Sequence, residues 1–134
     1  MANKQKGEVP ITLGDLDLVL KFDTNAIAEL ETALDSDYVS IMGALSDEKV
    51  SMRFVRAALF AGLQHDRRYA RGLSLKKIGK FITMENFSEL LGSVIRALLL
   101  MQGVDPDAID EMLGGDVESD PTKVIEASTK DPSP

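Results

Sequence analysis

The sequence predicts an α+β fold that is mainly helical, with an N-terminal β-hairpin packed on four to five helices and a disordered acidic C-terminal tail. Apolar residues near the amino end alternate with other residues on both sides of a Gly-Asp pair, which is typical of a hairpin. After residue 25, apolar residues recur every three or four positions, as in amphipathic helices. The residues after 113 are rich in Asp, Glu, Ser, Thr and Pro, a composition typical of disorder.

The length of 134 residues and the hydrophobic content of 44% fit one domain with its own core. We expect residues 1–7 to be a flexible N-terminus, residues 8–113 to form the domain and residues 114–134 to form the acidic tail. The longest apolar run, 97–101, is far too short to span a bilayer, and the amino end lacks the apolar stretch of a secretory signal. The sequence therefore predicts a cytoplasmic protein without a membrane partner.

The predicted hairpin turns at Gly14-Asp15. In its second strand the larger apolar residues share one face, whereas Asp17, Val19 and Lys21 lie on the other. The apolar residues of the two strands are Val9, Ile11, Leu13, Leu16, Leu18, Leu20 and Phe22. Because an isolated hairpin is only marginally stable, we expect its apolar face to cover the helices.

Three helices are predicted next. Asp23 to Asn25 supply N-cap candidates for a helix over 25–35, and a second, short helix is expected over 38–45. Ser51 caps the third helix, whose apolar side chains form one stripe: Phe54, Val55, Ala58, Leu59, Gly62 and Leu63. This stripe predicts an amphipathic helix that faces the core.

Residues 64–72 lack an apolar period and predict a loop. Ser74 caps a short helix that carries Leu75, Ile78, Phe81 and Ile82. We expect the last long helix to begin at Thr83 and to be terminated by Gly103. Its predicted buried stripe is Phe87, Leu90, Leu91, Val94, Ile95, Leu98 and Leu99. Asp105 to Asp107 can start one further turn.

The end of this last helix is apolar around most of its circumference, where Leu98, Leu99, Leu100 and Met101 follow one another. Two interpretations remain open: these residues form the centre of the core, or they form a partner groove or self-association surface. We take them as candidate partner-binding residues. Most of the methionines at positions 42, 52, 84, 101 and 112 are interpreted as core packing rather than as adaptable contacts.

The formal net charge of -7 is concentrated at the carboxyl end. Residues 1–104 contain thirteen acidic and thirteen basic side chains, whereas residues 105–134 contain nine acidic and two basic ones. Within residues 65–80, Asp66 is the one acid among six basic side chains: Arg67, Arg68, Arg71, Lys76, Lys77 and Lys80. We take these six as candidate contacts to an acidic protein surface, with a solvated face as the alternative. A basic loop for nucleic acid is disfavoured because the attached tail would repel phosphate.

The chain has few side chains suited to catalysis. The chain has no Cys and one His, His65, which lacks a second ligand or nucleophile at a useful spacing. The acidic group around Asp105 lacks the glycine and the distal glutamate of a calcium-binding loop and fits a helix start better. No phosphate-binding glycine motif occurs. We therefore expect a non-enzymatic protein with no catalytic, cofactor or metal site.

Three stretches resemble a known family: GEVPITLGDLDLVLKFDTNAIAELETALD, FVRAALFAGLQHD and SLKKIGKFI. They are similar to the small proteins encoded just upstream of the tape measure gene in gene transfer agents and long-tailed phages. The matching features are the Gly7-Glu8-Val9 opening, an apolar hairpin, a helix that contains Leu30-Glu31, and a helix that ends in Ala61-Gly62-Leu63. The resemblance covers roughly residues 7–103.

This resemblance implies a tail assembly chaperone, with residues 8–113 as its domain. Such a protein binds the tape measure protein in the host bacterial cytoplasm and keeps it soluble until tail tube protein subunits polymerise around it. It implies no catalytic residues, and its implied partners are the tape measure protein and the tail tube protein. Self-association is expected from the residues themselves, because a hairpin has open edges and the last helix has surplus apolar surface. The alternative is a structural tube or minor tail subunit, and a third hypothesis is an adaptor that uses the basic segment.

Overall fold

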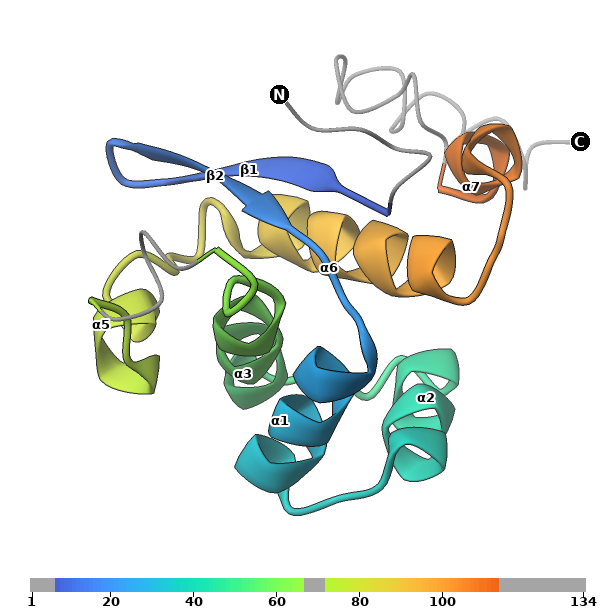
Figure 1. Ribbon diagram of the computed structural model, residues 1–134, viewed down its shortest axis with the longest axis horizontal. Coiled ribbons are helices and arrows are strands. Elements are labelled where there is room, and N and C mark those ends of the chain that lie inside the picture. The colour runs from blue at the N-terminus through green and yellow to red at the C-terminus, as the bar shows by residue number, and fades with distance from the viewer. Residues whose placement is uncertain (1–6, 67–71, 114–134) are drawn as a thin grey trace, which may run out of the picture.

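A computed structural model describes residues 7–66 and 72–113 of the chain. Figure 1 shows an antiparallel hairpin followed by helices, which confirms the predicted mainly helical α+β class. The elements are β1 (Val9–Leu13), β2 (Leu16–Leu20), α1 (Thr24–Leu34), α2 (Tyr38–Ser46), α3 (Met52–Gly62), α5 (Leu75–Gly79), α6 (Phe87–Met101) and α7 (Pro106–Met112). The described residues thus contain six helices, because the predicted further turn after Asp105 is a helix in its own right.

The hairpin has the predicted turn and places its apolar face on the helices. Val9 pairs with Leu20 and Leu13 with Leu16, so the turn falls at Gly14, whose φ of 60° lies in the left-handed region that glycine tolerates best. A Cβ atom at Gly14 would lie 2.6 Å from Cε1 of Phe81. The tip of the hairpin is therefore packed on the segment that follows α5.

Local side-chain caps explain where most helices begin. The predicted caps Asp23, Ser51 and Ser74 each accept a hydrogen bond from a backbone N–H of the first turn of α1, α3 and α5. Asp35, with φ 51°, ends α1, and Asp37 caps α2. The predicted break between the first two helices therefore lies between Asp35, which ends α1, and Asp37, which caps α2.

One helix starts later than the sequence predicts. Thr83 was expected to begin the last long helix, yet α6 starts at Phe87. The backbone N–H of Thr83 donates to Oδ1 of Asn86 at 2.7 Å, and the N–H of Asn86 donates back to Oγ1 of Thr83 at 3.2 Å. Nδ2 of Asn86 also donates to the carbonyl of Phe81 at 2.8 Å. These bonds stabilise a turn ahead of the helix.

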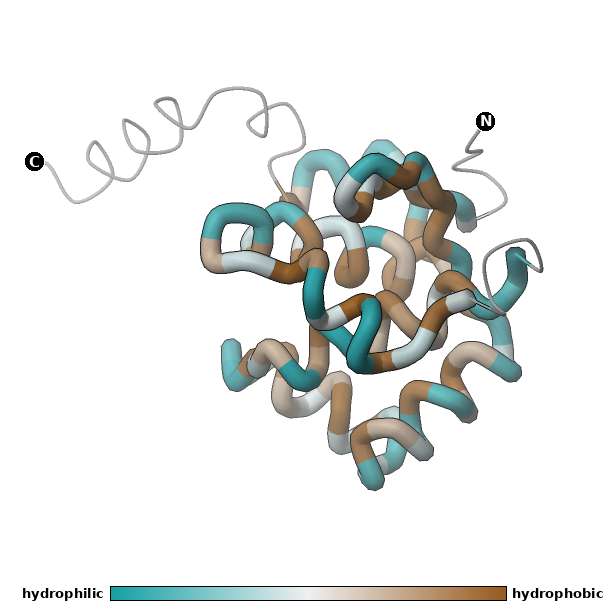
Figure 2. The backbone as a smooth tube through the Cα atoms, turned by 90° about the vertical axis from the view of Figure 1, so that its left-hand side faces the viewer, coloured by the Kyte–Doolittle hydropathy of each residue, from teal (hydrophilic) through white to brown (hydrophobic). Residues whose placement is uncertain are grey.

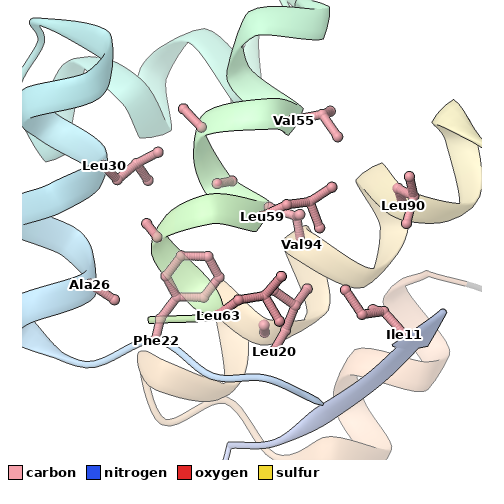
Figure 3. Close-up of a cluster of buried hydrophobic side chains, with 14 of the residues drawn as sticks. Ile11, Leu20, Phe22, Ala26, Leu30, Val55, Leu59, Leu63, Leu90 and Val94 are labelled. Atoms are coloured by element: carbon pink, nitrogen blue, oxygen red, sulfur yellow. The ribbon is translucent and has the colours of Figure 1, made fainter. Parts of the chain in front are cut away.

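The core lies where the hairpin, α1, α3 and α6 meet (Figure 3). Side chains from all four converge there, and the alternation of hydrophobic and hydrophilic residues along the backbone can be followed in Figure 2. A Cβ atom at Gly62 would lie 2.7 Å from Cδ2 of Leu20 and 3.1 Å from Cζ of Phe22, so a glycine there allows α3 to approach the end of β2. This contact fixes the hairpin on the helical body.

None of the described helices is long and apolar enough to cross a membrane. Residues 1–6 of the predicted flexible N-terminus, the acidic tail over 114–134 and the three arginines Arg67, Arg68 and Arg71 lie outside the described residues.

Candidate partner-binding surface

The four apolar residues at the end of the last helix, which the sequence offers as partner-binding candidates, differ in how deeply they are buried. Leu98 is 2% exposed and belongs to the core, on the same side of α6 as Val94. It is therefore not available to a partner in this conformation, contrary to its assignment from the sequence. Leu99, Leu100 and Met101 are half-buried, and the latter two pack against the core. Leu99 is the member of the run that faces away from it.

Leu99 lies on an outer stripe of α6. Ile95, Leu99 and Gln102 are spaced by four and three residues, so they share one side of the helix and its end. Ile95 and Leu99 are both half-buried, and neither is among the half-buried residues that pack against the described core cluster. This stripe is apolar and lacks a partner within the core.

Gln102 joins this stripe to α2. Its side-chain Nε2 donates to the hydroxyl of Tyr38 and approaches Sδ of Met42 at 3.5 Å. Val39, three residues before Met42, is its neighbour on the helix surface and is 79% exposed. We use the name α2–α6 face for Val39 and Met42 of α2 together with Ile95 and Leu99 of α6, four apolar residues on the two helices that the Gln102 contact links. Figure 1 shows α2 below the carboxyl end of α6, as this contact requires.

The composition of α2 explains why an apolar surface remains. Its sequence, YVSIMGALS, contains no charged residue, and Tyr38, Ile41, Met42 and Leu45 face the core. The exposed positions of α2 are Val39, Ser40, Gly43 and Ser46, so Val39 is the one large apolar residue of this helix that is exposed. The sequence does not single out Val39, and it predicts Ile95 and Leu99 in the buried stripe of the last helix, whereas both are half-buried outside the core cluster. The absence of charged residues from α2 is the signal that could have drawn attention to Val39.

A small surface hollow lies beside α2. It has a volume of about 160 Å³ and lies between the end of α1, α2 and the start of α3. Its apolar lining is Leu34, Ile41, Ala44, Leu45 and Phe54, and Ser36, Ser40, Lys49 and Ser51 complete it.

The described part of the basic segment lies elsewhere. Lys76, Lys77 and Lys80 are exposed on and just after α5, and within the described chain their side chains have no ion-pair partner. Figure 1 places α5 at one end of the molecule and the α2–α6 face at the other. The two sets of predicted site residues therefore do not form one site.

Three of the five methionines are exposed, which corrects their assignment to core packing. Met52 is the first residue of α3, Met84 lies in the turn before α6, and Met112 is the last residue of α7. Met42 and Met101 are half-buried and pack against the core.

His65 has a structural contact. Its Nε2 lies 2.7 Å from the carbonyl oxygen of Val19, the outer residue of β2, and the N–H of Lys21 donates to the carbonyl of Gly62 at 3.0 Å. Together these bonds cover that edge of the hairpin. On the other edge Pro10 has no N–H to offer a further strand. Both edges are thus partly closed to pairing.

Within the described ranges, no group of three or more His, Cys, Asp or Glu residues is placed to hold a metal. Asp105 accepts the N–H of Asp107 at 2.8 Å and caps α7, as expected for a carboxylate at a helix start. An open groove of about 740 Å³ between the hairpin and α6 has a mixed lining, in which Asp17 and Glu89 lie beside the apolar residues Ile11, Leu18 and Leu90.

Comparison of the chain with protein-family models, curated proteins and solved structures gave no match.

Proposed function

We propose that this chain is a tail assembly chaperone that binds the tape measure protein and keeps it soluble until the tail tube polymerises around it. The family resemblance of residues 7–103 supplies the class of partner. The observation that supports it best is the α2–α6 face: Val39 is 79% exposed on α2, and Gln102 links that helix to α6, where Ile95 and Leu99 are half-buried outside the core cluster.

The proposed client, the tape measure protein, explains why an apolar face is needed. A long amphipathic helical protein exposes apolar stripes that associate with one another in water until a partner covers them. An apolar face built from two helices can hold such a stripe, as in other helix-in-groove complexes. The α2–α6 face consists of apolar side chains from two helices.

Met42 on the α2–α6 face supports the same function. A chaperone contacts many segments of a long client, so its surface benefits from side chains that can rearrange. Met42 is half-buried and provides a flexible, polarisable contact.

Co-expression tests the proposal. The chain is produced together with the tape measure protein encoded beside it, and the soluble fraction of that protein is compared with its soluble fraction when it is expressed alone. We expect a large rise in soluble protein and co-purification of the two chains. No rise and no co-purification would reject the function.

A second measurement distinguishes a chaperone from a structural tail subunit. A chaperone leaves the complex before assembly ends, so we expect the chain in lysates and not in purified particles. Mass spectrometry that finds it in particles at a ratio similar to a tube protein would assign it to the tail.

A further inference from the structure

The two edges of the hairpin differ in what lies beside them. At the β2 edge, His65 contacts the carbonyl of Val19, and the N–H of Lys21 donates to the carbonyl of Gly62. The β1 edge lies on the side of α6, which packs against β1 more extensively than against β2 and runs along the hairpin in Figure 1. The β1 edge is therefore the edge that the described chain leaves for an added strand.

The β1 edge presents backbone groups that β2 does not bond. Pro10 is paired with Val19 and has no N–H, and the Val19 carbonyl contacts His65, so these two paired residues do not bond to each other. Bonded and non-bonded pairs alternate along an antiparallel hairpin, so Thr12 and its partner Asp17 form a second non-bonded pair. The N–H and carbonyl of Thr12 and the carbonyl of Pro10 thus point outward. No other backbone group of the described residues bonds to them.

These outward groups border the groove of about 740 Å³ between the hairpin and α6. Its helical wall is Asn86, Glu89 and Ser93, which are spaced by three and four residues and lie on one side of α6 and its start. Its other wall includes Thr12 and Asp17. Asp17 and Glu89 supply two carboxylates, and none of the described residues that line the groove is basic. This lining suits an extended segment that carries basic side chains.

The chain enters β1 through a residue that favours a reversal. Gly7 lies in a turn and has a φ of 80°, the value typical of the third residue of a type II turn. A chain that turns there runs back along β1. The residues before it, 1–6, lie outside the described residues and include Lys4 and Lys6. Six extended residues span about 20 Å, enough to follow a strand of five residues, about 17 Å long.

We propose that residues 1–6 occupy this groove as a third strand, antiparallel to β1 and bonded to the outward groups of Pro10 and Thr12. The two lysines of the segment then lie near the two carboxylates of the groove, which adds a modest attraction. The segment covers the edge that could otherwise pair with another chain. Because Pro10 offers no N–H, the added strand makes few hydrogen bonds and can be displaced. This inference does not rest on the proposed function.

Hydrogen exchange of the full chain, followed by NMR, tests the proposal with an internal reference. The amides of Thr12 and Asp17 both point outward, but only the amide of Thr12 lies at the β1 edge. After correction for the intrinsic rates, we expect the Thr12 amide to exchange at least about tenfold more slowly, because it exchanges only when the added strand opens. Equal protection of the two amides would overturn the inference.

A matched pair of glycine variants tests the turn. A Cβ atom meets nothing within 4 Å at either Gly7 or Gly43, but only Gly7 has a positive φ. Gly7→Ala therefore strains the reversal without any steric clash, and Gly43→Ala does not. We expect the protection of the Thr12 amide to fall several-fold in Gly7→Ala and to stay unchanged in Gly43→Ala.

A matched pair of lysine variants tests the charges. Lys4→Gln with Lys6→Gln removes the two charges of the segment, whereas Lys49→Gln with Lys77→Gln removes two exposed charges that do not line the groove. We expect only the first variant to lower the protection of the Thr12 amide, and 0.5 M salt should lower it in the unchanged chain, on the order of the screening at that ionic strength.

The source of the protection is read from its dependence on concentration. A segment of the same chain protects the Thr12 amide equally at all chain concentrations. Protection that rises with concentration would assign the edge to a second copy and overturn the inference. Protection that Gly7→Ala and the substitution of both segment lysines leave unchanged would also overturn it, because neither the reversal nor the charges would then hold the strand.

Discussion

Two neighbouring leucines of α6 have opposite environments. Leu98 is 2% exposed in the core, whereas Leu99 lies on the outer stripe of the helix. The change Leu98→Ala should lower the free energy of unfolding by about 2–5 kcal/mol, because it leaves a cavity. The change Leu99→Ala should lower it by less than about 1 kcal/mol. Urea denaturation of both variants checks this difference, and equal losses would contradict the placement of the two side chains.

A second prediction at the residue scale concerns acid. Because the pKa of Asp37 is lowered in the folded chain, the stability contributed by its charge is present above the unfolded pKa, near pH 4. That contribution is lost as the pH falls through the folded pKa. The variant Asp37→Asn should therefore show a shallower loss of stability below about pH 4. Urea midpoints at pH 6 and pH 3 measure it, and identical pH profiles would contradict the role of the carboxylate.

At the scale of elements, two helical glycines form a matched pair. A Cβ atom at Gly62 would collide with Leu20 and Phe22, whereas a Cβ atom at Gly92 would meet no atom within 4 Å. We expect Gly62→Ala to destabilise the fold by about 1–3 kcal/mol through overpacking. We expect Gly92→Ala to stabilise it by about 0.5–1 kcal/mol, because alanine favours the helix. Thermal unfolding distinguishes the two signs, and a stabilising Gly62→Ala would show that β2 is not held against α3.

The hairpin edges give another prediction at this scale. Pro10 removes a donor from one edge, and His65 contacts the Val19 carbonyl on the other. The double variant Pro10→Thr, His65→Ala opens both edges, so we expect self-association to increase with concentration relative to the unchanged chain. Sedimentation velocity at several concentrations measures it. If the two sedimentation profiles are the same, the edges do not control association.

The elements that the sequence predicted well are those set by local contacts. Period-two alternation fixed the hairpin, and the caps Asp23, Ser51 and Ser74 fixed three helix starts, because each cap bonds within its own first turn. The start of α6 was predicted too early. In the sequence Thr83 looks like an N-cap, but in the structure it forms hydrogen bonds with Asn86 in a turn that precedes the helix.

The surface was harder to predict because it depends on packing between distant segments. That Leu98 is buried and Leu99 is not follows from the direction in which α6 meets the core. Gln102, just after α6, contacts Tyr38 and Met42 of α2, which lie 64 and 60 positions earlier in the chain. A pattern of neighbouring residues cannot predict a contact between such distant segments. The sequence therefore indicated the apolar end of α6 but did not locate the α2–α6 face.

At the scale of the whole molecule, the surface is divided between two ends. The α2–α6 face lies at the end of the molecule that carries α2, and Lys76, Lys77 and Lys80 lie on and just after α5 at the other end (Figure 1). The proposed chaperone function depends on the first of these ends. A client held there would leave the lysines free for other contacts.

The most direct test compares two exposed apolar residues in cells that also produce the tape measure protein. Val39 and Met84 are 79% and 83% exposed, and only Val39 belongs to the α2–α6 face. Circular dichroism first establishes that Val39→Asp and Met84→Asp are folded. We predict that the unchanged chain and Met84→Asp keep the tape measure protein soluble, while Val39→Asp loses most of this effect. If Val39→Asp protects the client as well as the unchanged chain does, the face is not the binding surface and the account is wrong.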